Sequence, residues 1–106
     1  MEIENQVKYV LSGRNLIIQL PGEVDDHTCK GLREETEAYI RSRHINRLIF
    51  DFSKTGFMDS AGIGVLLSRY RRMKEVGGDV LLSGEDASVR RLLRISGIYQ
   101  IMDSIG

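Results

Sequence analysis

The stretch RLIFDFSKTGFMDSAGIGVLLSRYRRMKEVGGDVLLSG, residues 47–84, places two short apolar segments on either side of an amphipathic one. Arg47–Phe52 is a nearly continuous apolar run, which is typical of an interior strand covered on both faces. The segment IGVLLSRYRRMKEVGG has apolar residues at helical spacing, and Gly77 lies where a helix would end. The predicted apolar face of this helix consists of Ile63, Leu66, Leu67, Tyr70 and Met73. With DVLLSG as the next strand, the order predicts a parallel pair joined by a helical crossover.

The flanking segments extend this pattern in both directions. Val7–Leu11 and Leu16–Leu20 are β-rich and predict a hairpin, which Pro21 and Gly22 end. A helix is expected from about Asp26 to Arg43, after helix-start residues that include Asp25. Its apolar face comprises Cys29, Leu32, Thr36, Tyr39 and Ile40. EDASVRRLLRISG predicts a third helix with Val89, Leu92, Leu93 and Ser96 along one stripe, and IYQIMDSI a last short strand. The order β-β-α-β-α-β-α-β predicts an α/β domain.

Length and composition limit the kinds of function. We expect one domain over residues 1–106, with 42% hydrophobic and 28% charged residues. Fifteen basic and fifteen acidic side chains cancel, so no global field attracts nucleic acid or an anionic membrane. The N-terminus lacks signal-peptide features, and no apolar stretch approaches the roughly 20 residues of a membrane helix. We therefore expect a cytoplasmic protein that binds neither nucleic acid nor membrane.

Cys29 is the single cysteine, and His27 lies two residues before it. This proximity raises the alternatives of a metal site or thiol catalysis. No second cysteine or acidic ligand cluster has metal-site spacing, so we expect a small buried thiol and no metal. We also expect no cofactor.

Ser60, in FMDSAGIG, could have three roles: nucleophile, phosphate-binding residue or modification target. As an N-cap, its oxygen would accept a hydrogen bond from the N–H of Gly62 or Ile63. Capping does not explain Gly62 and Gly64, since each glycine costs a helix interior about 1 kcal/mol relative to alanine. We infer that something approaches the backbone closely there. A phosphate on Ser60 would lie beside the free N–H groups of the helix.

Catalysis by Ser60 lacks its usual partners. A P-loop requires lysine and then Ser or Thr after its second glycine, but Ile63 follows Gly62. A nucleophile elbow requires glycine two residues before the serine, where this chain has Met58. His27 or His44 could act as the base, but no third triad member accompanies them. We expect a non-enzyme in which Ser60 is a kinase substrate read by a partner protein, since added charge would repel an acidic rim. A small hydrolase using Ser60 and His27 is the alternative.

Three segments, GEVDDHTC, DFSKTGFMDSAGIGVLLSRYRRMKEVGGDVLL and SVRRLLRISGIYQIM, resemble the STAS domain of bacterial anti-sigma factor antagonists, most of all the sporulation type. The resemblance implies a mixed sheet of about four to five strands, with helices packed mainly on one side. It implies that the unphosphorylated protein binds an anti-sigma factor that is also a serine kinase, and so frees the sigma factor. The kinase would phosphorylate Ser60, and a PP2C-type phosphatase would restore it.

The same resemblance implies roles for particular residues. Asp59 and Gly62 would shape the loop around Ser60, and Asp25 would lie beside it for partner recognition, cap a helix, or do both. The implied partner-binding surface comprises Asp25, Asp59, Ser60, Ala61, Gly62 and Ile63. Many relatives have a second serine at the position of Ala61, and usually continue with one more helix after the point where this chain stops. We expect a monomer, while weak nucleotide binding at the loop and a stress-signalling role stay open.

Overall fold

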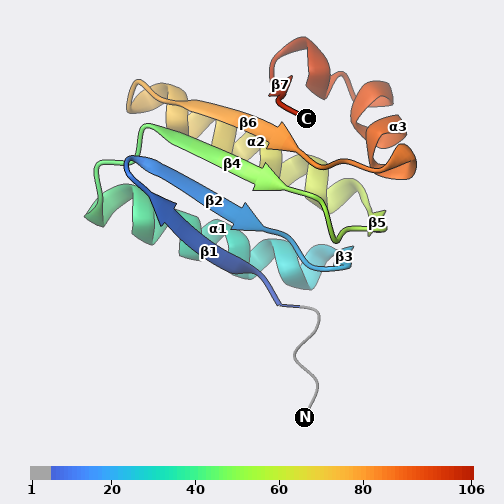
Figure 1. Cartoon of the computed structure of the whole chain (residues 1–106), viewed down its shortest axis with the longest axis horizontal. Coiled ribbons are helices and arrows are strands. Elements are labelled where there is room, and N and C mark those ends of the chain that lie inside the picture. Colours follow the sequence, from blue (N-terminus) through green and yellow to red (C-terminus); the bar gives the residue numbers. More distant parts are fainter. Residues whose placement is uncertain (1–5) are drawn as a thin grey trace.

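The computed structural model describes residues 6–106, which form a five-stranded mixed sheet with two helices packed against one face (Figure 1). The sheet order is β1-β2-β4-β6-β7. The strands are β1 (Lys8–Ser12), β2 (Asn15–Gln19), β4 (Arg47–Asp51), β6 (Asp79–Ser83) and β7 (Asp103–Ser104). β1 pairs with β2 in antiparallel orientation, and the other neighbours are parallel. The predicted fold class is confirmed.

The helices are α1 (Asp26–Ser42), α2 (Ser60–Glu75) and α3 (Ala87–Ile95), with a 3₁₀ helix, η1 (Ile98–Gln100). Figure 1 shows α1 and α2 side by side behind the sheet, while α3 lies beyond the end of β6 and the chain then turns back to β7. Each of the two parallel steps, β2 to β4 and β4 to β6, is therefore connected through a helix on the same face of the sheet.

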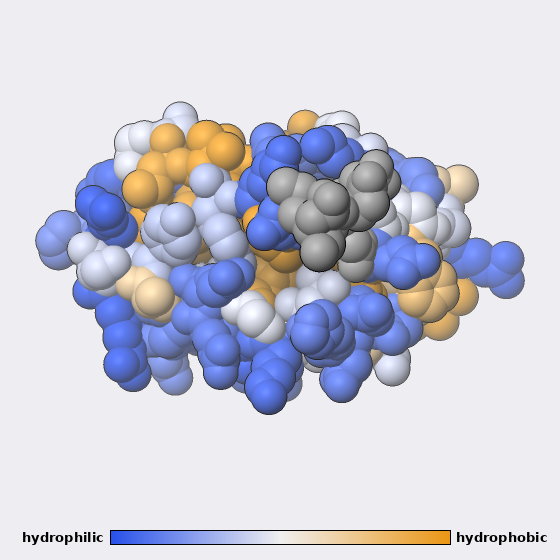
Figure 2. Space-filling model, turned by 90° about the horizontal axis from the view of Figure 1, so that it is seen from below, coloured by the Kyte–Doolittle hydropathy of each residue, from blue (hydrophilic) through white to orange (hydrophobic). Residues whose placement is uncertain are grey.

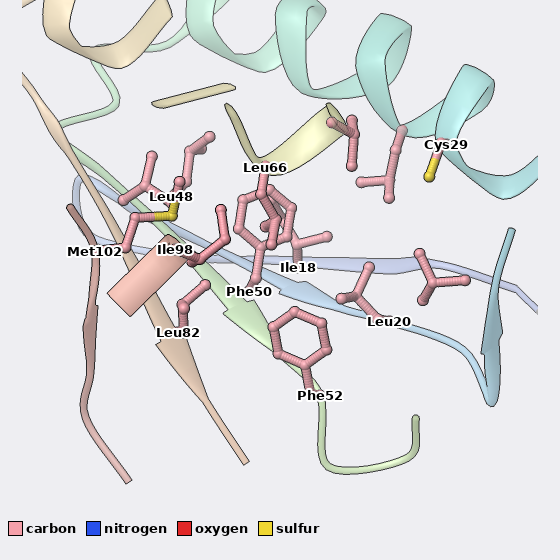
Figure 3. Close-up of a cluster of buried hydrophobic side chains, with 14 of the residues drawn as sticks. Ile18, Leu20, Cys29, Leu48, Phe50, Phe52, Leu66, Leu82, Ile98 and Met102 are labelled. Atoms are coloured by element: carbon pink, nitrogen blue, oxygen red, sulfur yellow. The ribbon is translucent and has the colours of Figure 1, made fainter. Parts of the chain in front are cut away.

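The core lies between the sheet and the pair α1 and α2. Alternate residues of the central strands point toward the helices and are buried, because side chains in a strand alternate between its two faces. They are Leu16, Ile18, Leu48, Phe50, Val80 and Leu82. In Figure 3, Leu66 of α2 lies against Phe50, and Cys29 of α1 lies beside the same cluster. Burying each large apolar side chain contributes roughly 1.5–3 kcal/mol, so this layer holds the helices on the sheet.

Within residues 6–106, α1 and α2 both cover the same face of the sheet, and the opposite face is left open (Figure 1). Ile17, Ile49 and Leu81 are paired neighbours there, and all three are only half-buried. The prediction that Arg47–Phe52 is covered on both faces was therefore wrong. The outward residue of β4, Ile49, is only half-buried. Figure 2, seen from below the view of Figure 1, shows a hydrophobic patch at the upper left and mainly hydrophilic residues along the lower border.

Several predicted boundaries needed correction. The helix expected from Ile63 begins three residues earlier, at Ser60, and its buried face is Gly62, Val65, Leu66, Arg69 and Met73. The segment IYQIMDSI is not one strand but the turn of η1 followed by the two residues of β7. Gly97 allows this turn because its φ of 79° lies in the left-handed region, which glycine adopts without a steric penalty.

A second, two-stranded parallel sheet was missed from the sequence. It consists of β3 (Glu23–Val24) and β5 (Phe57–Met58), which follow β2 and β4 along the chain. Two residues are too few to show the alternation that identifies a strand. Among residues 6–106, no helix combines the length and the apolar character needed to cross a membrane.

Candidate functional site

The pairing of β3 with β5 brings the beginnings of α1 and α2 together. Val24 is in register with Met58, and the Asp59 N–H donates to the Val24 carbonyl at 3.2 Å. In each case the strand is followed by one aspartate and then by the helix. Asp25 and Asp59 are thus neighbours in space, although 34 residues separate them in the sequence. This arrangement presents two helix N-termini side by side at one end of the molecule.

Both aspartates cap their helices. The Asp25 Oδ1 accepts from the Thr28 N–H at 3.0 Å and from the Thr28 hydroxyl at 3.1 Å. These hydrogen bonds, above all the one from the Thr28 backbone, hold the pKa of Asp25 below its usual value, so the carboxylate stays ionised. The Asp59 Oδ1 accepts from the Ala61 N–H at 2.9 Å. The capping role expected of Asp25 is confirmed.

Ser60 is exposed and is the first residue of α2, not its cap. Asp59 occupies the N-cap in the extended conformation that this position needs, with φ −101° and ψ −173°. The expectation that Ser60 Oγ receives a backbone N–H of its own helix was therefore wrong. Within residues 6–106 the Ser60 hydroxyl has no hydrogen-bond partner, so it is free to react with a visiting group.

The two glycines after Ser60 differ sharply. Gly62 is buried, and a Cβ there would lie 2.5 Å from Met58 Sδ and closer still to its Cγ. The close approach expected at Gly62, which lies in the first turn of α2, is therefore made by the protein's own Met58. Gly64 is exposed, and a Cβ there would meet nothing within 4 Å. The neighbouring Ala61 and Ile63 are half-buried.

The two histidines considered as a base for Ser60 both belong to the region of α1. His27 is exposed in the first turn of α1, and His44 lies beyond the opposite end of that helix. In the described part of the chain neither imidazole makes a hydrogen bond to Ser60, and no three His, Cys, Asp or Glu residues form a metal-binding group. Cys29 is buried as predicted, and burial raises the pKa of its thiol to about 11. It is thus an unreactive thiol.

A groove of about 400 Å³ lies between α1 and α2 and includes Ala61, the neighbour of Ser60 in the sequence. Its lining residues are Asp26, Cys29, Lys30, Arg33, Ala61 and Gly64. Sequence reasoning missed Lys30 and Arg33 as members of the site. Their spacing from Asp26 and Cys29 does place all four on one stripe of α1, but the sequence gives no sign of which element that stripe faces.

The sequence pattern of the STAS domain matches residues 6–105. The chain belongs to the STAS domain family. One relative is the anti-sigma F factor antagonist of Paenibacillus polymyxa, 36% identical over 87 residues, which cover 82% of this chain and 74% of the relative. The family expected from FMDSAGIG and GEVDDHTC is thereby confirmed.

Two solved structures share the fold along almost the whole STAS domain. The anti-sigma factor antagonist SpoIIAA in its unphosphorylated form is 27% identical, with a TM-score of 0.87 over 95% of this chain and 89% of SpoIIAA. The phosphorylated form of SpoIIAA, a Bacillus cell fate determinant, is 26% identical, with a TM-score of 0.77 over 95% of this chain and 92% of SpoIIAA. The same architecture thus occurs in an unphosphorylated and a phosphorylated antagonist.

Proposed function

We propose that this STAS protein is an anti-sigma factor antagonist that is switched by phosphorylation of Ser60. The unphosphorylated form binds an anti-sigma factor that is also a serine kinase, and the sigma factor is released. The observation that carries the proposal is the exposed Ser60 hydroxyl, which has no hydrogen-bond partner among residues 6–106 and stands at the start of α2. The names of the relatives support the choice of partner.

The kinase supplies the chemistry and this chain supplies the acceptor. Ser60 Oγ bonds to the γ-phosphorus of ATP while the bond from that phosphorus to the bridging oxygen breaks, ADP leaves, and the hydroxyl proton passes to a base of the kinase. A PP2C-type phosphatase reverses the state by hydrolysing the new ester. The chain itself needs no catalytic group for either step.

Phosphorylation changes the surface that the partner meets. The phosphate adds roughly −1.5 to −2 charges. Two carboxylates, those of Asp59 and Asp25, already lie at the starts of α2 and α1. The added charge therefore repels an acidic partner surface and resists burial, although the partial positive charge at the start of α2 accommodates it within the domain. Asp25, Asp59, Ala61 and Ile63 form the rest of the contact surface, while the buried Gly62 supports it from below.

The proposal is tested by incubating the protein with the anti-sigma factor of the organism that encodes it and ATP. Mass spectrometry should find one phosphate, on Ser60. Ser60→Ala should bind the anti-sigma factor like wild type without becoming phosphorylated, and Ser60→Asp should bind at least about tenfold more weakly, since like charges at an interface are costly. Phosphate on another residue, or equal affinities of the two variants, would refute the switch.

The Paenibacillus polymyxa relative favours an anti-sigma F factor as the partner over one from a stress-signalling pathway. The two alternatives share the chemistry at Ser60 and differ only in the partner. Binding to the organism's anti-sigma F factor, measured beside its other anti-sigma factors of the same kinase type, separates them. Tighter binding to one of the others would assign the protein to a different pathway.

A further inference from the structure

The groove between α1 and α2 is lined by Ala61, the residue directly after the proposed phosphorylation site. Ser60 and Gly64 are four residues apart, so they lie one turn apart on the same face of α2. Gly64 and Ala61 form the α2 side of the groove, and neither has a side chain that would fill it. The groove of about 400 Å³ is large enough for several side chains.

Nothing in the fold requires a glycine at position 64. Gly62 has to be glycine because Met58 occupies the place of a Cβ, whereas the corresponding place at Gly64 is open space. Glycine disfavours a helix interior relative to alanine, so Gly64 weakens α2 without relieving any contact within the described chain. What the absent side chain does provide is an open groove between α1 and α2.

The charges that line the groove are mostly positive. Lys30 and Arg33 are exposed, and neither forms an ion pair with any residue from 6 to 106. Asp26 is the one acidic residue in the lining. Lys30 and Arg33 follow Asp26 by four and seven residues on the same helix, and among residues 6–106 no carboxylate forms a salt bridge with either. They complement a carboxylate brought by a partner, because charge-assisted hydrogen bonds from Lys and Arg to carboxylates are strong.

We propose that this groove receives an acidic segment of the anti-sigma factor, with its carboxylates on Lys30 and Arg33 and its chain passing close over Gly64. This inference rests on the proposed function and identifies what the phosphate acts on. A phosphate on Ser60 lies one helical turn from Gly64 and repels the acidic segment that the groove holds.

The substitution Gly64→Ala tests whether the glycine serves partner binding rather than protein stability. Gly31 provides a matched control, since it also lies inside a helix, a Cβ added there would meet nothing within 4 Å, and it is absent from the groove lining. Both Gly64→Ala and Gly31→Ala should raise the melting temperature by about 3–6 °C. Only Gly64→Ala should weaken binding to the anti-sigma factor, by about tenfold, and Gly64→Leu should weaken it further, because overpacking a contact is costly.

Charge reversal tests the chemistry of the occupant. Lys30→Glu and Arg33→Glu should each weaken binding by at least about tenfold, and Arg43→Glu, at the far end of α1, should leave it unchanged. The measurement is made with and without ATP. A loss seen only when nucleotide is present would assign the two cations to nucleotide phosphates and overturn the acidic-segment proposal.

The outcomes also separate this inference from the proposed function. Suppose that the wild-type protein binds the anti-sigma factor and is phosphorylated on Ser60. If Gly64→Leu, Lys30→Glu and Arg33→Glu then bind as tightly as wild type, the groove proposal alone is overturned. Wild-type protein that binds no anti-sigma factor would overturn both.

Discussion

At the scale of single residues, Asp25 combines a helix cap with a charge at the proposed partner surface. Asp25→Asn keeps an oxygen that can accept from the Thr28 N–H, whereas Asp25→Ala removes it. We expect Asp25→Ala to lower the free energy of unfolding by about 1 kcal/mol and Asp25→Asn to change it by a few tenths, in urea denaturation. Equal losses would mean that the charge, rather than the hydrogen bond, stabilises α1. In a separate binding measurement, weaker binding of Asp25→Asn to the anti-sigma factor would show that the charge of Asp25 takes part in partner recognition.

Gly62 carries the second prediction at this scale. Gly62→Ala gains roughly 1 kcal/mol of helix propensity but forces the new methyl against Met58, which is buried and cannot move away freely. Overpacking of this kind costs about 1–3 kcal/mol, so after the gain in helix propensity we expect a net loss of up to about 2 kcal/mol. A double-mutant cycle with Met58→Ala should show a coupling above about 0.5 kcal/mol. Additive effects would mean that the strain lies elsewhere.

At the scale of elements, Glu37 of α1 holds α2 in place. Its Oε1 accepts from Arg69 Nη1 at 2.9 Å, and its Oε2 accepts from Arg72 Nε at 3.0 Å. The Arg69 side chain is only 8% exposed, so its charge depends on this carboxylate. Glu37→Gln leaves that charge without a counterion. We expect a loss of about 1–3 kcal/mol, less than for a fully buried pair because Glu37 is 24% exposed. The exposed Glu34→Gln on the same helix is the control, with no measurable change.

The same carboxylate predicts a pH dependence. The hydrogen bond from Arg69, followed by those from Arg72, lowers the pKa of Glu37 in the folded protein. The unfolded chain therefore takes up this proton first, and acid favours unfolding. The stabilisation is complete above the ordinary glutamate pKa of about 4.3 and is lost as the pH falls through the lower folded value. Urea midpoints measured from about pH 6 to about pH 3 should fall less steeply for Glu37→Gln than for wild type. Parallel curves would contradict the assignment.

At the scale of the whole molecule, the proposed switch acts on a surface and leaves the fold intact. The core lies between the sheet and the two helices, whereas Ser60 is exposed at one end of α2. An acidic group at a helix N-terminus is stabilising by about 0.3–1 kcal/mol, and the nearby Asp25 and Asp59 offset part of this. We expect Ser60→Asp to leave the free energy of unfolding within about 1 kcal/mol of wild type. A loss above about 2 kcal/mol would mean that the added charge acts by unfolding the domain.

The order of the main strands and helices followed from the sequence because local periodicity reports it. The hairpin, α1, β4, β6 and α3 lie within a few residues of their predicted positions, since each is long enough to show a repeat of about 2 or 3.6 residues. Ser60 was singled out for a related local reason, because it stands between a short apolar segment and an amphipathic one.

Only the tertiary structure decided what surrounds Ser60. The pairing of β3 with β5 places Asp25 beside Asp59, and the packing of α1 against α2 forms the groove at Lys30 and Arg33. The tertiary structure also distinguishes the two glycines, because core packing requires a glycine at position 62 and leaves open space at position 64. These features join parts of the chain that lie far apart in sequence, so no local repeat encodes them. A sequence determines its helices and strands through neighbouring residues, but a site of this kind exists only once those elements are packed together.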